Sequence, residues 1–496
     1  MLAARTGEAH PMSLSALLER EDGAYADTMV SGLALDSRRV GPGDLFLAMP
    51  GDVHDGRQFI EQAVANGACA VLAEAPAAGF VDALPVPLVE WPDLRLEAGP
   101  LAARFYREPS RDMQVTGITG TNGKTTTSRL IAQLAHALGR QCGVIGTLGA
   151  TLDDGVEDAG NTTPDALALQ RQLAAWRDQG VGAVSMEVSS HALVQGRVNG
   201  VSFTTAIYTN LSHDHLDYHG SLGSYARAKL RLFATPQLRH SVVNVDDDLA
   251  ALVAAATTEG AQILTYSARG AGADVRVLNT RFHGAGVRGE LHTPWGSGEF
   301  DSPLPGAFNL ANLAAAVTAL ALAGEDLDAL LAAVAQLRPV PGRMQRVPNA
   351  LGLQVIIDYA HTPDALEHAL RALRPHVEGA LVAVFGCGGE RDRDKRQLMG
   401  RVACSHADQV IVTSDNPRGE DPMDILRDIE SGCSGSYALE PDRASAISAA
   451  LSSARSGDCV LIAGKGHEQY QLVEGEKLPF SDVAQARLAL ARRERT

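Results

Sequence analysis

The stretch that decides the fold is Val115-Thr116-Gly117-Ile118-Thr119-Gly120-Thr121-Asn122-Gly123-Lys124-Thr125. An apolar, β-branched run, typical of a strand, leads into the pattern Gly-x-x-Gly-Lys-Thr, and helix-forming residues follow over 126–138. Glycines let a backbone approach phosphate closely, and a helix N-terminus offers free N–H groups and a positive dipole. In such a loop Lys124 would neutralise phosphate charge and the Thr125 hydroxyl would bind Mg²⁺. The stretch therefore predicts a phosphate-binding loop for ATP.

The loop departs from the usual pattern at its start. The common form of the motif places a glycine five residues before Gly123, where this chain has Ile118, so that Gly120 is its first loop glycine. We interpret it as a shortened variant. A chance match in an ordinary turn is the alternative, and the strand before the loop and the helix after it favour a nucleotide site.

Composition sets the broad class. A chain of 496 residues is too long for one core, and the length predicts roughly three domains. The 45% hydrophobic and 21% charged residues are typical of a globular protein, and the net charge of −16 argues against nucleic-acid binding, although a few arginines could still hold a small anionic substrate. The six cysteines include no Cys-x-x-Cys pair, so we expect reduced thiols that form neither a metal site nor a disulfide framework.

The N-terminal residues do not form the apolar core of a signal peptide, because Arg5, Glu8 and His10 interrupt it. Met12 is a candidate natural start, since Ser13 begins the first helix-like segment. The most apolar long run, 310–322, is too short to span a bilayer. We expect a cytoplasmic protein that is not inserted in a membrane, and a monomer is the simplest expectation.

Strand-like and helix-like runs alternate through most of the chain, which predicts an α/β protein. We expect three domains, over residues 1–110, 111–339 and 340–496: a small α/β domain, a central nucleotide-binding domain with a mostly parallel sheet, and a Rossmann-like α/β domain. The boundaries fall at the polar segment 109–112 and at the proline-rich joint Arg338-Pro339-Val340-Pro341-Gly342-Arg343.

The last domain has three apolar strands that each end in a polar loop. The predicted strands are 380–385, 409–413 and 459–463. Because the carboxyl ends of parallel strands share one edge of a sheet, their loops predict a site for a polar ligand. The loops are Gly386-Cys387-Gly388-Gly389-Glu390-Arg391-Asp392, Ser414-Asp415-Asn416-Pro417-Arg418 and Gly464-Lys465-Gly466-His467-Glu468.

The middle domain holds further polar candidates. Glu187 follows the predicted strand 181–186, where a carboxylate is the expected Mg²⁺ partner of Thr125, with a helix-capping acid as the alternative. The histidine-rich segment 213–219 lacks the ligand pattern of a zinc site and favours a polar loop, in which one histidine could serve a hard cation beside phosphate. Taken alone, Lys229 is best interpreted as a solvated lysine on a helix.

Two Thr-Pro-Asp segments predict helix starts. Thr163 and Thr362 each precede proline, so each is expected to cap a helix whose first residue is that proline. Capping does not explain Asp358, at the end of the predicted strand 355–357.

Together these motifs resemble the Mur ligase family, and most closely the members that add the third amino acid to the peptidoglycan precursor. The resemblance covers nearly the whole chain. Most of its motifs are weak singly, but their order is highly specific. Besides the phosphate loop and the three C-terminal loops, it rests on Leu35-Asp36-Ser37-Arg38, Gly43-Asp44-Leu45-Phe46, Asp55-Gly56, Asn161-Thr162-Thr163-Pro164, the run 187–191, Asp214-His215-Leu216-Asp217-Tyr218-His219, Asn309 and Gly342-Arg343.

The resemblance implies roles for the matching residues. Lys229 matches the lysine that this family carbamylates to make a carboxylate-like Mg²⁺ ligand, which replaces the interpretation as a solvated lysine. The implied catalytic residues are Lys124, Glu187, His215 and Lys229, and the implied metal ligands are Thr125, Glu187, His215 and carbamylated Lys229. Implied ATP contacts are Gly120, Thr121, Asn122, Gly123, Lys124, Thr125, Thr126, Asn309, Arg343 and Asp358. Implied contacts to the UDP-muramoyl-dipeptide are Leu35, Ser37, Asp52, Val53, His54, Asn161, Thr162, Thr163, Ser189, Gln195 and Arg197. Implied contacts to the amino acid are Arg391, Asp415, Asn416, Pro417, Arg418, Gly464 and Glu468.

The resemblance also implies the reaction. A D-glutamate side-chain carboxylate attacks the γ-phosphate of ATP to give an acyl phosphate, and an incoming amine then displaces phosphate. Two Mg²⁺ ions and Lys124 would offset the charge of the reactants. Closure of the third domain over the second would keep water from the acyl phosphate.

The incoming amino acid depends on one loop. Asp415-Asn416-Pro417-Arg418 matches the form associated with meso-diaminopimelate, whose distal carboxylate Arg418 could bind with two hydrogen bonds. Glu468 suits an ammonium group. L-lysine and L-ornithine remain the alternatives.

Other functions stay open at this point. Folylpolyglutamate synthase shares the shortened loop and the chemistry but lacks a first domain with Asp36-Ser37-Arg38. The D-alanyl-D-alanine-adding Mur ligase has that domain but lacks the Asn-Pro-Arg loop. An ATP-switched binding protein is the non-enzymatic alternative, and it would not need three polar loops at one edge of a sheet.

Overall fold

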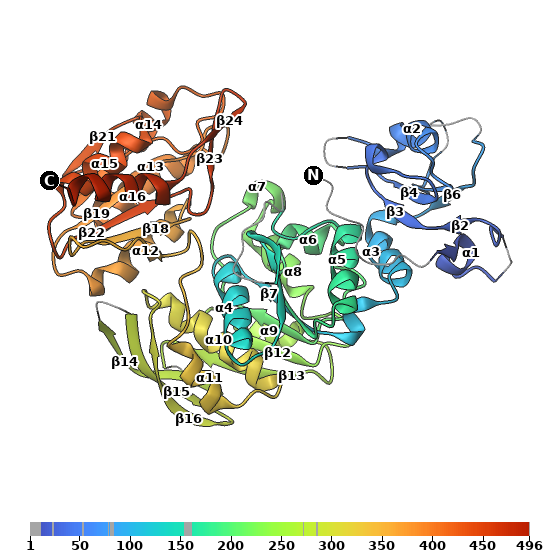
Figure 1. Ribbon diagram of the computed structural model, residues 1–496, viewed down its shortest axis with the longest axis horizontal. Helices are drawn as coiled ribbons and strands as arrows, with labels where there is room; N and C mark the ends of the chain where they lie inside the picture. Colours follow the sequence, from blue (N-terminus) through green and yellow to red (C-terminus); the bar gives the residue numbers. More distant parts are fainter. Residues whose placement is uncertain are drawn as a thin grey trace.

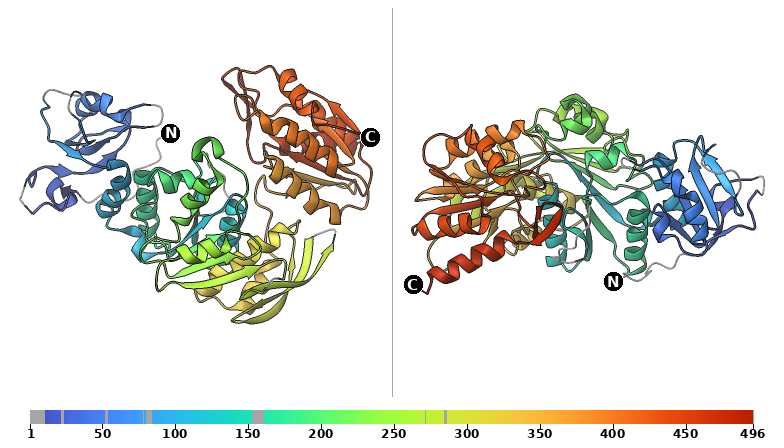
Figure 2. Two further views of the ribbon diagram at one scale, coloured as in Figure 1. Left: turned by 180° about the vertical axis from the view of Figure 1, so that it is seen from behind. Right: turned by 90° about the horizontal axis from the view of Figure 1, so that it is seen from above.

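The computed structural model describes residues 11–21, 24–51, 54–77, 79, 84–152, 161–270, 272–283 and 286–495. Three bodies follow one another along the long axis of the molecule, each with its own main sheet (Figure 1). The N-terminal body is blue, the central one runs from cyan to yellow, and the C-terminal one is orange to red. The same separation is visible from behind (Figure 2).

The N-terminal domain has a parallel sheet in the order β3-β4-β5-β6. Every residue of β4 is buried, as expected for a parallel strand with both faces covered. The strands are β3 (Gly32–Ala34), β4 (Asp44–Ala48), β5 (Ala70–Glu74) and β6 (Leu88–Trp91), with a small antiparallel pair β1 (Met12–Ser13) and β2 (Met29–Val30). The helices are α1 (Leu14–Leu17), η1 (Ser37–Arg39), η2 (Gly56–Phe59), α2 (Ile60–Ala65) and α3 (Leu94–Phe105).

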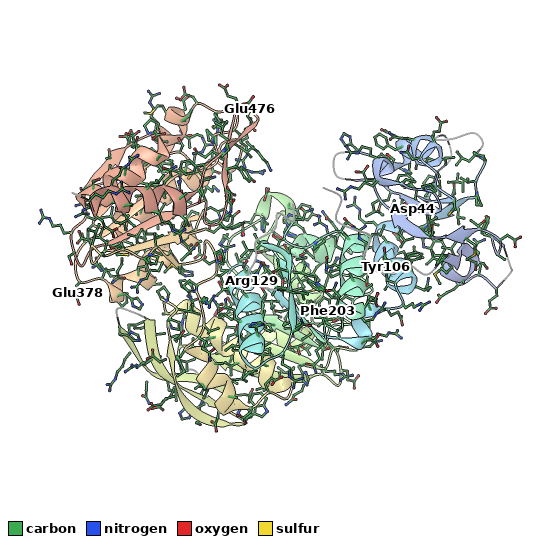
Figure 3. The ribbon with its side chains drawn as sticks, viewed as in Figure 1. Asp44, Tyr106, Arg129, Phe203, Glu378 and Glu476 are labelled. Carbon is green, nitrogen blue, oxygen red and sulfur yellow. The ribbon has the colours of Figure 1, made fainter. Side chains whose placement is uncertain are left out.

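Helix α3 joins this domain to the central one by packing on α5 (Ala166–Asp178). Tyr106, labelled in Figure 3, lies at this junction, and its carbonyl accepts a hydrogen bond from Arg177 Nη1 at 2.9 Å. A Cβ on Gly99 would overlap the carbonyl oxygen of Asn199, so the backbones of the two domains touch here. The short helix η3 (Pro109–Asp112) then leads into the central sheet.

The described strands of the central domain form one ten-stranded sheet in the order β16-β15-β14-β13-β12-β11-β7-β10-β8-β9. The sheet is parallel from β14 to β8, with antiparallel strands at both ends. The strands are β7 (Gln114–Thr119), β8 (Cys142–Gly146), β9 (Gly149–Thr151), β10 (Ala183–Glu187), β11 (Thr205–Tyr208), β12 (His240–Asn244), β13 (Gln262–Ser267), β14 (Val275–His283), β15 (Gly286–Thr293) and β16 (Gly296–Ser302).

Helices cover both faces of this sheet and bury two separate cores. One face carries α4 (Lys124–Ala137), α10 (Phe308–Leu322) and α11 (Leu327–Val334). The other carries α5, α6 (Ser190–Val194), α8 (Leu222–Leu230) and α9 (Ala250–Ala256), with α7 (Leu216–His219) just before α8. Phe203 (Figure 3) shows why β7 contains glycine: a Cβ on Gly117 would lie 2.7 Å from its ring.

The C-terminal domain has a sheet in the order β17-β18-β22-β19-β20-β21, parallel except for β17. The strands are β17 (Gln345–Arg346), β18 (Gln354–Asp358), β19 (Leu381–Phe385), β20 (Gln409–Val412), β21 (Tyr437–Leu439) and β22 (Cys459–Ala463), and β23 (Tyr470–Val473) and β24 (Glu476–Pro479) form a hairpin. The helices are α12 (Pro363–Leu373), η4 (Arg374–His376), α13 (Asp394–His406), α14 (Pro422–Glu430), α15 (Arg443–Ser453) and α16 (Asp482–Arg493).

The α/β fold is confirmed, with one main sheet in each of the three bodies, and one local expectation is wrong. Thr163 does not cap a helix: Asp165 caps α5 by accepting from the N–H of Ala168, and the Thr163 hydroxyl is used elsewhere. Asp358 lies at the end of its strand, as expected, and is the last residue of β18. Thr362 does cap α12, with Pro363 as the first helical residue. No helix in the described ranges is both long and apolar enough to cross a membrane.

Candidate active site

The phosphate loop lies at the centre of the central sheet. β7 pairs with β10 and β11, and the loop 120–123 connects its carboxyl end to α4. Gly123 has φ of +88°, and a Cβ there would lie 2.5 Å from Asn312 Oδ1 on α10. A Cβ on Gly120 would overlap the Thr209 hydroxyl. Both positions therefore require glycine, and the loop exposes its backbone to whatever lies in front of α4.

Lys124 is the first residue of α4. Its Nζ donates to the carbonyl oxygens of Gly120 at 2.8 Å and Thr121 at 2.9 Å, so the ammonium lies over the loop itself. Burial lowers the pKa of Lys124, while the carboxylates of Glu187 and Asp214 act in the opposite direction. A cation at the N-terminus of a helix that follows a glycine loop is suited to a polyphosphate.

Glu187 lies beside the start of α4, at the end of β10. Its Oε2 accepts a hydrogen bond from Thr125 Oγ1 at 2.8 Å, and its Oε1 accepts from the N–H of Thr147 at 2.7 Å. A Cβ on Gly146 would overlap this carboxylate, so the glycine makes room for it. Helix α6 is capped by Ser189, so Glu187 is not a capping acid. A paired hydroxyl and carboxylate fit the oxygen ligands that Mg²⁺ requires.

Lys229 on α8 is buried, with 1% of its surface exposed, and its Nζ lies 4.1 Å from the centroid of the Tyr225 ring. The interpretation as a solvated lysine, made from the residues alone, is therefore wrong. Burial and the nearby charge of Lys124 hold the pKa of Lys229 well below its ordinary value. A lowered pKa increases the neutral fraction of an amine, and the neutral form is the one that reacts with electrophiles such as CO₂.

His215 lies between these groups and the protein surface. Its backbone is left-handed, with φ of +53°, and its ring centroid lies 4.8 Å from that of His191. Burial is the main cause that lowers the pKa of His215, which favours the neutral imidazole that binds metals. The nearby His219 is engaged with Ser190, at 2.9 Å between Nε2 and Oγ. Within the described ranges no cluster of three or more His, Cys, Asp or Glu side chains is ready to hold a metal.

One cavity of about 800 Å³ brings these groups together. It is lined by residues 121–126 and by all four proposed metal ligands, Thr125, Glu187, His215 and Lys229, whereas Gly120 is not part of its wall. The C-terminal domain supplies Arg343, Asp358 and much of α12 to its wall. The guanidinium of Arg343 stacks on Tyr359 at 4.5 Å, and its Nε is buried with no hydrogen-bond partner among the described residues. An unsatisfied buried donor beside the loop fits an anionic ligand such as ATP.

One of the implied ATP contacts, Asn309, does not line this cavity. Asn309 is buried behind the cavity, and its carboxamide bonds Pro305 and Asn312. Asn312 instead lines the cavity and contacts the loop at Gly123. The helical spacing of three residues puts both on one face of α10, which is the signal that could have identified Asn312. Asp358 accepts hydrogen bonds from the N–H groups of Met344 and Ala360, and burial raises its pKa.

A second cavity, of about 530 Å³, lies between the N-terminal and central domains. Ser37 in its wall donates to Gln62 Oε1 at 2.7 Å. The implied contacts to the UDP-muramoyl-dipeptide that line it are Leu35, Ser37, His54, Gln195 and Arg197. Asp52 and Val53 lie outside the described residues.

Other proposed dipeptide-binding residues lie on the side of the larger cavity. Thr162 and Ser189 line that cavity, whereas Asn161 is exposed and lines neither. Thr163 connects the two regions: its hydroxyl donates to the Glu187 carbonyl at 2.9 Å, and its own carbonyl accepts from Arg197 Nη1 at 3.0 Å. Thr163 therefore links the wall of one cavity to the wall of the other.

The three polar loops of the C-terminal domain meet at one edge of its sheet, as expected. Arg418 Nη1 donates to the Gly389 carbonyl at 2.7 Å, and Asn416 Nδ2 donates to Glu468 Oε2 at 3.0 Å. A Cβ on Gly464 would lie 2.5 Å from Asp415 Oδ2. A Cβ on Gly388 would approach both Arg418 and Arg391. Sequence reasoning missed Lys465, whose fully buried Nζ bonds both Asn416 and Glu468.

Three segments of the chain match family models. Residues 29–106 match one described as Mur ligase family, catalytic domain, residues 118–320 match the Mur ligase middle domain, and residues 342–466 match the Mur ligase glutamate ligase domain.

Relatives named UDP-N-acetylmuramoyl-L-alanyl-D-glutamate–2,6-diaminopimelate ligase are similar over almost the full length. The one from Pseudomonas aeruginosa is 47% identical over 97% of this chain and 98% of its own. The one from Synechococcus elongatus is 48% identical over 95% of this chain and 96% of its own. A solved structure with the same enzyme name is 40% identical, covers 98% of this chain and 100% of its own, and superposes with a TM-score of 0.74.

Proposed function

The chain belongs to the Mur ligase family, and on that premise we propose that it joins meso-diaminopimelate to UDP-N-acetylmuramoyl-L-Ala-D-Glu in an ATP-dependent reaction. The geometric observation that carries the proposal is the larger cavity. There the phosphate loop, Glu187, His215 and Lys229 of the central domain face Arg343 and Asp358 of the C-terminal domain. L-lysine and L-ornithine are the alternative amino acids.

The reaction requires two bond changes. The D-glutamate carboxylate attacks the γ-phosphorus and releases ADP, and the amine then attacks the acyl carbon and releases phosphate and a proton. In the proposal the loop N–H groups, Lys124 and Arg343 hold the phosphates, which offsets their repulsion of the incoming carboxylate. Thr162 and Ser189 line the same cavity and are placed to hold the dipeptide end of the substrate.

Mg²⁺ would supply further charge neutralisation at the phosphates when bound. The proposal assigns one ion to Thr125 and Glu187 and a second to His215 and carbamylated Lys229. The carbamate forms when the neutral amine of Lys229 adds to CO₂ and loses a proton, and the low pKa of this buried lysine supports that step. The product is an anion, which places a negative charge beside Lys124, where a protonated lysine would place a second positive one.

The UDP-sugar is assigned to the cavity between the first two domains, lined by Leu35, Ser37, Gln195 and Arg197. The amino acid is assigned to the edge where Asn416, Arg418 and Glu468 meet. A guanidinium beside a carboxylate suits an amino acid with a second carboxylate and a second ammonium group, as meso-diaminopimelate has.

The test is phosphate release from ATP with Mg²⁺ and UDP-N-acetylmuramoyl-L-Ala-D-Glu, with meso-diaminopimelate, L-lysine and L-ornithine each supplied separately. We expect turnover when the amino acid supplied is meso-diaminopimelate, and none with L-lysine or L-ornithine. Turnover only with lysine or ornithine would keep the ligase and reject the assignment of Arg418. ATP hydrolysis that needs neither substrate would favour an ATP-switched binding protein. We also expect a monomer in size-exclusion chromatography and a cytoplasmic location on cell fractionation.

A further inference from the structure

Lys465 has an unusual environment for a lysine. It is the second residue after β22, and its side chain is fully buried. Its Nζ donates to Glu468 Oε2 at 2.8 Å and to Asn416 Oδ1 at 2.9 Å, and it lies 5.8 Å from the centroid of the Tyr470 ring. Burying an ammonium group is costly unless it is paired, so this lysine needs a partner of opposite charge. Glu468 supplies that charge.

The contacts of Lys465 fix the orientation of Asn416. The Asn416 Oδ1 accepts both from Lys465 and from the N–H of Leu472, at 3.0 Å, so its Nδ2 must face Glu468, to which it donates at 3.0 Å. A flipped amide would place an NH₂ group against two donors. The buried ammonium therefore specifies which end of this carboxamide faces the carboxylate.

The same contacts fix Glu468. Its Oε2 accepts from both Lys465 and Asn416, whereas its Oε1 has no hydrogen-bond partner among the described residues. The side chain keeps 18% of its surface exposed, so this second oxygen can be reached by a ligand. One oxygen is thus committed to the protein, and the other is left for an external donor.

We propose that Lys465 is a positioning residue for the incoming amino acid, which holds Asn416 and Glu468 so that Glu468 Oε1 receives an ammonium group of the diamino acid. This inference rests on the proposed function, because it takes the edge at Asn416, Arg418 and Glu468 as the amino-acid site. Lys465 itself does not touch the substrate. It acts through the two side chains that do.

The variant that tests the role is Lys465→Met, which removes the charge and keeps a similar length. We expect the KM for meso-diaminopimelate to rise about 10- to 100-fold, as for the loss of hydrogen bonds to a charged group, with kcat at saturation changed less than about threefold. The KM values for ATP and for the UDP-substrate should stay the same. Lys477→Met is the matched control, because Lys477 also lies over Tyr470, at 4.4 Å, but is exposed on the hairpin.

A double-mutant cycle tests whether Lys465 acts through Glu468. Glu468→Gln should raise the same KM, and adding Lys465→Met to it should raise it further by less than about threefold. Lys465→Arg keeps a cation and should restore the KM to within about fivefold of the wild type. If Lys465→Met fails to fold, Lys465→Arg is the variant that is measured in its place.

Several results would overturn the inference. They are an unchanged KM for the amino acid in Lys465→Met, an equal rise of all three KM values, a loss of kcat alone, and full additivity in the Glu468→Gln background. If the wild type turns over no amino acid, the proposed function fails and the inference falls with it. Wild-type turnover is measured first, so failure of the proposed function can be told apart from failure of the inference. In the second case the wild type is an active ligase, but its KM for meso-diaminopimelate does not depend on Lys465.

Discussion

Glu420→Gln is the substitution whose effect the structure predicts most quantitatively. Both carboxylate oxygens of Glu420 accept from Arg396, each at 2.9 Å, and Arg393 adds a third contact at 3.0 Å. The N–H of Glu390 also donates to this carboxylate. Arg396 is buried, and its other ion pair is with Asp428 at 2.9 Å. The carboxylate thereby connects the loop before α13 to the loop before α14, two of the three loops of the proposed amino-acid site.

These contacts hold the pKa of Glu420 at about 2, against 4.5 in an ordinary glutamate, and the hydrogen bonds from Arg396 are the largest cause. A difference of about 2.5 units corresponds to at most about 3.4 kcal/mol of folding free energy. The side chain is 16% exposed and partly screened by solvent, so we expect Glu420→Gln to cost about 1–2 kcal/mol. A carboxyl group whose pKa is depressed by folding stabilises fully above its unfolded pKa. This contribution should therefore be lost as the pH falls from about 4.5 to about 2.

The assay is urea-induced unfolding of the full chain with hydrogen exchange measured in peptides covering 386–396 and 414–430. The difference in the free energy of unfolding between wild type and Glu420→Gln should be largest near neutral pH. It should fall by more than half by about pH 3. Asp424→Asn is the control, because Asp424 forms an exposed pair with Arg427 and should change stability by less than about 0.5 kcal/mol. Equal stability of Glu420→Gln and wild type, or a difference independent of pH, would refute the reasoning.

Three further predictions concern the proposed active site. Gly123→Ala should weaken ATP binding by at least about tenfold in a fluorescence titration, since the Cβ would lie 2.5 Å from Asn312, whereas Gly139→Ala, with open space around it, should not. In ¹³C-bicarbonate the wild type should show a carbamate NMR signal that Lys229→Met lacks, and a signal retained in that variant would contradict the assignment. Arg418→Ala should raise the KM for meso-diaminopimelate about 100-fold, and an unchanged KM would reject its role.

The sequence was most informative where structure is determined by neighbouring residues. The phosphate loop, its preceding strand and its helix were predicted within a few residues: the helix was expected over 126–138 and spans Lys124–Ala137. The strand Cys459–Ala463 was predicted with its observed bounds. Alternating apolar runs and glycine turns are local signals, and they predict the parallel sheet edge at which three polar loops meet.

Contacts between distant segments could not be predicted in this way. The residues around Lys229 predict a lysine exposed to solvent on a helix, yet packing of the central domain buries its side chain. Thr163 has the local pattern of a helix cap, but its hydroxyl is engaged by the backbone at the end of β10, and the cap moves to Asp165. The roles that the resemblance implies for individual residues stay predictions, and the experiments above are their tests.

The sheet of the C-terminal domain explains how two of the proposed sites depend on each other. Asp358 ends β18 and lines the nucleotide cavity, and β18 pairs with β22 so that Asp358 lies opposite Ala463. The N–H of Gly464 then donates to the Asp358 carbonyl at 3.1 Å. Neighbouring strands lie only about 4.8 Å apart, so the nucleotide wall and the amino-acid loop are two ends of one rigid ladder. In the proposed function, a movement of this domain toward the phosphate loop would carry the proposed amino-acid loop with it, and we expect closure over ATP and delivery of the amine to be coupled.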